Sequence, residues 1–167
     1  MKIVLIAMLL TVSAFAQSPS SQIALACGPQ GINFDVKLDN SQHTVVQPAP
    51  GKAQVYFIQD RSLQSFRIGE PVVSMIGIDG AWTGENKNDS YFSVSVEPGE
   101  HHVCAHIQPR PIELSHFIAE AGNIYYFRER IIPSAPFGVY LSLNLVDSDE
   151  AKYLIATYPL SVSHLKK

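Results

Sequence analysis

Apolar and polar residues alternate along most of this chain, and the alternation limits it to a strand-rich fold. The pattern is clearest in YFSVSVEPGEHHVCAHI, residues 91–107. Successive side chains of an extended strand point to opposite faces, so a period of two predicts half-buried β-strands. Pro98 and Gly99 interrupt the pattern and predict the turn of a hairpin. The side chains expected to face the core from its two arms are Phe92, Val94, Val96, Val103, Ala105 and Ile107.

Further strands are predicted on both sides of this stretch. Asp79 and Gly80 lie between apolar flanks. Such a pair suits a type I′ turn, whose two central residues need positive φ, so we expect a tight hairpin here. Another hairpin is expected to turn at Ala121 and Gly122. Single strands are predicted over residues 32–39, 53–59 and 139–146.

One segment near the C-terminus carries a helix signal. Asp147 is followed three positions later by Glu150, as in a capping box, and Pro159 ends the run. We expect a short helix between them. Many strands with turn signals and this single short C-terminal helix predict an all-β fold, an antiparallel β-sandwich that is either Ig-like or a partly closed barrel.

The first residues have the composition of a secretory signal peptide. An apolar run over residues 3–12 is followed by the small residues Ala14 and Ala16. We expect residues 1–16 to be removed and the mature chain to begin at Gln17. The apolar run is too short to span a bilayer, which predicts no stable membrane insertion of the mature chain and a periplasmic or secreted location.

Composition limits the function as well as the fold. Apolar residues make up 46% of the chain and charged residues 16%, which excludes intrinsic disorder. The formal net charge is −3, without a cluster of lysine and arginine, and this argues against a nucleic-acid partner. About 150 residues remain after cleavage, enough for one domain. We expect an N-terminal segment over residues 17–31 and a single β-sandwich domain over residues 32–167.

Several segments together resemble the DUF2846 family, exported bacterial domains of unknown function. The likeness extends over most of the mature chain, from Ile32 to Ser163. It implies an exported bacterial β-domain and brings no established catalytic residues. The segments that carry it are CGPQGINFDVKLDNSQH, PGKAQVYFIQD, IGIDGAWTGENKNDSYFSVSVEPGEHHVCA, AEAGNIYYFRER and VDSDEAKYLIATYPLSVS.

His102, Cys104 and His106 lie two residues apart and therefore share one face of the predicted strand. They could form part of a metal site. However, residues i and i+4 of a strand stand about 13 Å apart, so both histidines cannot easily bind one ion. Two cysteines in an exported chain favour a disulfide between Cys27 and Cys104. Free thiols are the remaining alternative.

Trp82 and Tyr91 are candidate ligand-binding residues. An exposed surface formed by both rings could stack on a sugar or on an apolar partner. The other interpretation places the single tryptophan in the core or at its edge, where most tryptophans of β-domains lie.

No nucleophile elbow of the G-x-S-x-G type is present in the sequence, so we expect no catalytic residue and no cofactor. The leading hypothesis is a non-catalytic binding or scaffolding domain of the bacterial envelope, with an unknown envelope protein or a glycan as its partner. One alternative is a metal-dependent or hydrolytic envelope enzyme that uses His102, Cys104 and His106. Another is a purely structural envelope protein without a small ligand.

Overall fold

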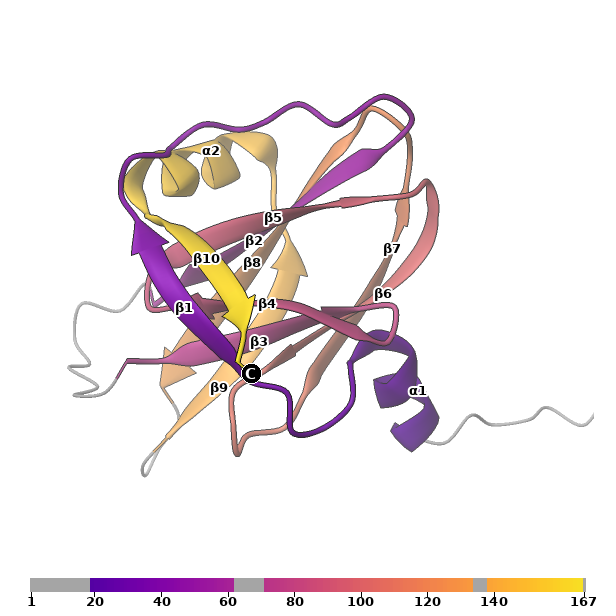
Figure 1. Ribbon diagram of the computed structural model, residues 1–167, viewed down its shortest axis with the longest axis vertical. Helices are drawn as coiled ribbons and strands as arrows, with labels where there is room; N and C mark the ends of the chain where they lie inside the picture. Colours follow the sequence, from indigo (N-terminus) through magenta and orange to yellow (C-terminus); the bar gives the residue numbers. More distant parts are fainter. Residues whose placement is uncertain (1–18, 62–70, 134–137, 167) are drawn as a thin grey trace, which may run out of the picture.

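The computed structural model describes residues 19–61, 71–133 and 138–166, which form two packed β-sheets and two short helices (Figure 1). The predicted signal peptide, residues 1–16, lies outside the described residues. Sheet A contains, in spatial order, β1 (Phe34–Asp39), β10 (Leu160–Leu165), β5 (Ser90–Val96), β2 (Ala53–Asp60), β8 (Ile124–Pro133) and β9 (Val139–Leu145). Sheet B contains β4 (Ala81–Lys87), β3 (Val73–Ile78), β6 (Gly99–His106) and β7 (Glu113–Ala119). The predicted β-sandwich is confirmed.

The predicted C-terminal helix is α2 (Ser148–Thr157), and it begins where the sequence indicated. The carboxylate of Asp147 accepts hydrogen bonds from the backbone N–H groups of Asp149 and Glu150, which have no partner within the helix. The Glu150 carboxylate pairs with Arg128 on β8. This ion pair ties the helix to sheet A, whose outer face it covers.

One predicted hairpin is confirmed and two are wrong. Asp79 and Gly80 join the paired strands β3 and β4 with φ values of 50° and 79°. By contrast, β5 and β6 belong to different sheets, and so do β7 and β8. The turns at Pro98–Gly99 and Ala121–Gly122 therefore carry the chain from one sheet to the other.

The reason is that a period of two defines which face of a strand is buried but not which strand lies beside it. The inward faces were predicted correctly for β5 and β6. Their apolar residues meet in one core between the two sheets, together with Val55, Phe57 and Phe127. Sheet A contributes Phe92, Val94 and Val96 to this core. Strand β6 of sheet B contributes Val103 and Ala105, and Ile107 follows directly after β6.

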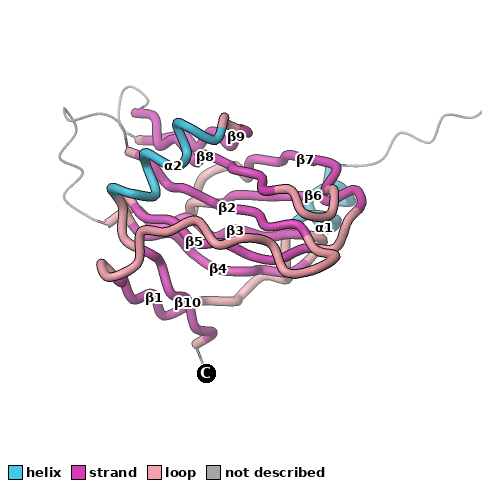
Figure 2. The backbone as a smooth tube through the Cα atoms, turned by 90° about the horizontal axis from the view of Figure 1, so that it is seen from above, coloured by secondary structure: helices cyan, strands magenta, loops and turns pink. Residues whose placement is uncertain are grey.

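Sheet A is mixed, whereas the sequence predicted only antiparallel pairing. β2 lies parallel to β8 over seven residue pairs, from Gln54–Ile124 to Asp60–Arg130. β10 lies parallel to β5 at a single pair, Leu160 and Tyr91. Beyond that pair, the ribbon of β1 and β10 splays away from the remainder of the sheet (Figures 1 and 2).

One end of the interior is polar. Glu129 of β8 is fully buried and accepts hydrogen bonds from Ser74 of β3 and Asn86 of β4. Burial raises the pKa of the Glu129 carboxyl to about 7, although these two hydrogen bonds favour its charged form. Gln59 of β2 donates to the Ser74 hydroxyl over 2.9 Å, so the two sheets are joined by polar contacts at this end.

Candidate functional site

The chain before the sandwich folds onto the outer face of sheet B. Helix α1 (Pro19–Ala26), which was not predicted from the sequence, lies against β6 and β3 (Figure 1). At its end, Cys27 is joined to Cys104 of β6 by a disulfide with a Cα–Cα distance of 5.6 Å. Both cysteines are buried. The predicted disulfide is therefore present, and it fixes the N-terminal segment to the centre of sheet B.

The N-terminal segment and sheet B lie so close together that Gly77 and Gly28 leave no room for a side chain. A Cβ atom at Gly77 of β3 would lie 2.8 Å from the carbonyl oxygen of Ala26 and 2.9 Å from Cys104 Sγ. A Cβ atom at Gly28 would lie 2.4 Å from the Trp82 ring. Glycine thus allows the backbones of the segment and the sheet to meet.

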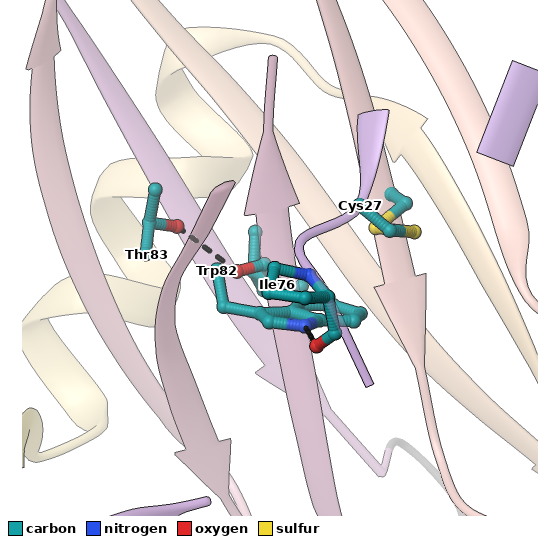
Figure 3. Close-up of a disulfide and its surroundings, with 6 residues drawn as sticks. Cys27, Ile76, Trp82 and Thr83 are labelled. Atoms are coloured by element: carbon teal, nitrogen blue, oxygen red, sulfur yellow. Dashed lines mark hydrogen bonds between the residues drawn. A yellow bond between two sulfur atoms is a disulfide. The ribbon is translucent and has the colours of Figure 1, made fainter. Parts of the chain in front are cut away.

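A β-bulge determines the side of the sheet on which Trp82 lies. Ile76 is opposite Gly84 and Gly77 is opposite Trp82, which leaves Thr83 as an extra residue in β4. The Thr83 hydroxyl donates to the carbonyl oxygen of Ile76 over 3.0 Å (Figure 3). In a regular strand Trp82 would share a face with Gly84, which packs on the core residue Phe92; the extra residue turns Trp82 outward instead.

On the outer face, the partly buried Trp82 packs beside the disulfide. Its Nε1–H donates to the carbonyl oxygen of Pro29 over 2.8 Å (Figure 3). The ring belongs to a small apolar cluster with Ala26, both cysteines, Ile23 and Ile112. This cluster is separate from the main core.

A pocket of about 470 Å³ opens beside this cluster. The segment from Cys27 to Ile32 forms one wall, and β3, β4, β6 and the loop after β6 form the others. Among the residues that the structure describes, no aspartate, glutamate, lysine or arginine lines it. The lining side chains are mainly apolar, with one imidazole and two amides. They include Ile23, Met75, Trp82, Ile112, His106, Gln30 and Gln108.

Comparison with known proteins identifies the family. A family model described as "Protein of unknown function (DUF2846)" matches residues 49–140, which is more than half of the chain. The chain belongs to the DUF2846 family. The matched residues include the pocket walls formed by the strands, with Met75, Trp82 and His106. The wall formed by residues 27–32 lies before the match.

The DUF2846 chain is also similar to an "Uncharacterized protein" of Haemophilus influenzae (strain ATCC 51907 / DSM 11121 / KW20 / Rd). The two are 26% identical over 132 residues, which cover 77% of this chain and 73% of the relative. No solved structure gives a significant match. Across the described ranges of this DUF2846 protein, no helix is both long and apolar enough to cross a membrane.

The structure does not bring the two predicted ligand-binding residues together. Trp82 lies at the pocket on sheet B, but Tyr91 of β5 is only 2% exposed and belongs to a cluster beneath α2 on sheet A. The Tyr91 hydroxyl donates to the carbonyl oxygen of Gln42 over 2.9 Å. The exposed Trp–Tyr surface considered from the sequence is therefore not formed, and Trp82 lies at the edge of an apolar cluster.

The three residues of the alternative metal site do share the outer face of sheet B. Cys104 is covered by the N-terminal segment, His106 lines the Trp82 pocket, and His102 is paired across the strands with His116 of β7. The Cys104 sulfur is bonded to Cys27 and is not available as a thiolate ligand. Where the structure describes the chain, no group of three or more histidine, cysteine, aspartate or glutamate side chains is arranged to hold a metal ion.

Proposed function

We propose that this DUF2846 domain is an exported, non-catalytic binding domain of the bacterial envelope, and that it holds an apolar group of a partner protein in the pocket beside Trp82. The observation that carries the proposal is the pocket itself. Its 470 Å³ volume lies within the range of small-ligand sites. Its wall of residues 27–32 is held in place by the disulfide and by the Trp82–Pro29 hydrogen bond.

The chemistry of the lining favours an uncharged, apolar occupant. Ile23, Met75 and Ile112 offer aliphatic contacts, and Met75 adapts its shape readily because its side chain is unbranched. Burying a charged group here would be unfavourable, because the described part of the lining offers no carboxylate, lysine or arginine as a partner. A leucine- or isoleucine-sized side chain of an envelope protein satisfies these conditions.

Export is part of the same proposal. Disulfides persist in oxidising compartments such as the periplasm and the cell exterior, and the Cys27–Cys104 bridge holds one wall of the pocket. A chain kept in the reducing cytosol would lose this tether. The predicted signal peptide supplies the route to a periplasmic or secreted location.

A glycan is the second candidate ligand. Trp82, His106 and Gln108 line the same pocket, and an indole with hydrogen-bonding side chains suits a sugar ring with its hydroxyl groups. The two candidates are distinguishable, because an apolar side chain needs no hydrogen bonds from the pocket, whereas a sugar does.

Trp82 is the only tryptophan of the chain, so its fluorescence reports on this pocket alone. We would titrate the exported, oxidised protein with acetyl-Ala-Leu-Ala-amide and, separately, with the trimer of N-acetylglucosamine. The proposal predicts a saturable change with the peptide, and Ile112→Ala should weaken binding about tenfold because it removes apolar contact area. Ile118→Ala is the matched control, since Ile118 is exposed on neighbouring β7 and does not line the pocket. Saturation by the sugar alone would favour the glycan, and no change with either probe would refute both.

A further inference from the structure

A second cleft lies in sheet A, where β5 and β10 separate. The two strands pair only at Tyr91 and Leu160, where the Tyr91 N–H donates to the carbonyl oxygen of Pro159 over 3.1 Å. On their other edges, β5 is paired with β2 as far as Val96, and β10 is paired with β1 as far as Leu165. In the part of the chain that the structure describes, no third strand lies between them.

The direction of the backbone groups follows from that one hydrogen bond. Amides of successive strand residues point to opposite edges. Because the Tyr91 amide points toward β10, the amides of Ser93 and Ser95 also point toward it, whereas those of Phe92 and Val94 point toward β2. The edge of β5 that faces the cleft therefore carries backbone donors and acceptors that have no ladder partner among the described strands.

A cleft of about 350 Å³ occupies this position. Four consecutive residues of β5, 91–94, and four consecutive residues of β10, 160–163, line it. Side chains of a strand alternate between its two faces, so consecutive residues can line one cleft only where the edge of the strand faces it. The cleft is thus bounded by two strand edges and not by the face of a sheet.

Hydrogen bonds from β10 to β4 of sheet B keep the cleft open. The hydroxyl groups of Ser161 and Ser163 donate to the carbonyl oxygen of Glu85 on β4, over 2.6 and 3.1 Å. The Glu85 N–H donates in turn to the Ser163 hydroxyl over 2.9 Å. These bonds satisfy the backbone groups of Glu85 at the outer edge of sheet B and hold β10 toward β4. Therefore β10 cannot close onto β5 without breaking them.

The lining also defines the charge of an occupant. Hydroxyl and amide side chains, among them Gln42, Thr44, Thr83 and Ser93, alternate with apolar ones. Within the described ranges, no aspartate, glutamate, lysine or arginine is among the lining residues. A segment that enters this cleft has to be uncharged along the residues that enter, because an ionised side chain would be desolvated without a partner.

We infer that the cleft between β5 and β10 accepts one extended, uncharged segment of a partner polypeptide, which pairs with the open edge of β5 by β-strand addition. In this mode of recognition the main-chain hydrogen bonds supply affinity, and pockets for alternate side chains supply specificity. The site shares no lining residue with the Trp82 pocket. It is therefore independent of the function proposed for that pocket.

Amide hydrogen exchange tests the inference first in the free protein. The Ser93 amide should exchange about 100-fold faster than the amide of Val94, which is paired with β2. Equal protection of Ser93 and Val94 would show that the edge is already paired, and would overturn the inference.

The second arm adds the capped peptide acetyl-Thr-Val-Ser-Val-Thr-Val-amide, with a control peptide in which proline replaces the central valine. The first peptide should slow exchange at Ser93 by at least about tenfold, and the control should not, because proline cannot donate to the ladder.

Two protein variants test the charge of the cleft. Thr44→Asp, at the exposed rim, should weaken peptide binding. Gln47→Glu is exposed in the same loop but lies outside the lining, so it should leave binding unchanged. The inference would be overturned by equal binding of the proline peptide, by unchanged Ser93 exchange at saturating peptide, or by a response confined to Trp82 fluorescence.

Discussion

The indole Nε1–H of Trp82 donates to the carbonyl oxygen of Pro29 over 2.8 Å, although the two residues are 53 positions apart in sequence. This bond joins a strand of the DUF2846 match to the segment that precedes it. Together with the Cys27–Cys104 disulfide, it makes residues 27–32 one wall of a pocket. The first two predictions concern the attachment of this segment.

Removing the disulfide should destabilise the protein strongly. The bridge spans 77 residues, and restricting a loop of that length in the unfolded chain stabilises the native state by about 4 kcal/mol. The double variant Cys27→Ala/Cys104→Ala should lose about that free energy of unfolding in urea, and its Trp82 fluorescence should shift to the red as the wall loosens. A loss below about 1 kcal/mol would mean that the bridge does not constrain the chain as described.

Gly77→Ala should be destabilising by about 1–3 kcal/mol, because the added methyl group meets the Ala26 carbonyl and Cys104 Sγ and one of the backbones has to move. Thermal unfolding measures the change. Asn144→Ala, at an exposed position of β9, is the control and should lie within about 0.5 kcal/mol of the parent. If both variants melt alike, the N-terminal segment does not pack against β3 at this point.

The buried carboxyl of Glu129 should make stability depend on pH. Its pKa is raised by burial from 4.5 to about 7, so between these values the folded protein keeps a proton that the unfolded chain has lost. The free energy of unfolding should therefore fall as pH rises from 4.5 to 7, by up to about 3 kcal/mol. Above pH 7 this group should cause no further loss.

Urea unfolding at pH 5 and pH 8 measures the effect. Glu129→Gln keeps the size of the side chain and stays neutral, so the variant should be more stable than the parent at pH 8 and should lose most of the pH dependence. The same decrease in stability in both proteins would assign the pH dependence to other groups.

The sequence pattern predicts which residues are buried, but it does not predict which strands become neighbours. The alternation in β5 and β6 predicted the buried faces, because that period reflects only burial. It could not predict that Pro98 and Gly99 lead into the other sheet, since a turn between two sheets and a hairpin turn use the same residues. The disulfide was predictable because a chain with two cysteines has one possible pair.

The candidate site was less predictable because it depends on contacts between distant parts of the chain. Trp82 faces outward only because Thr83 is an extra residue in β4, and the glycine that faces this bulge, Gly77, lies in another strand. Helix α1 has eight residues, PSSQIALA, with a weak amphipathic pattern, so its position depends mainly on the disulfide that follows it. These relationships appear only when the strands are placed in register.

The nuclear magnetic resonance signal of the single indole N–H tests the central claim, that an apolar group binds beside Trp82, most directly. We would follow this signal in the oxidised, nitrogen-15-labelled protein during titration with acetyl-Ala-Leu-Ala-amide. The account predicts a saturable shift of the Trp82 signal, together with shifts of the amides that line the pocket, such as those of Met75 and His106. A Trp82 signal that stays in place at saturating peptide, while amides elsewhere shift or none do, would contradict it.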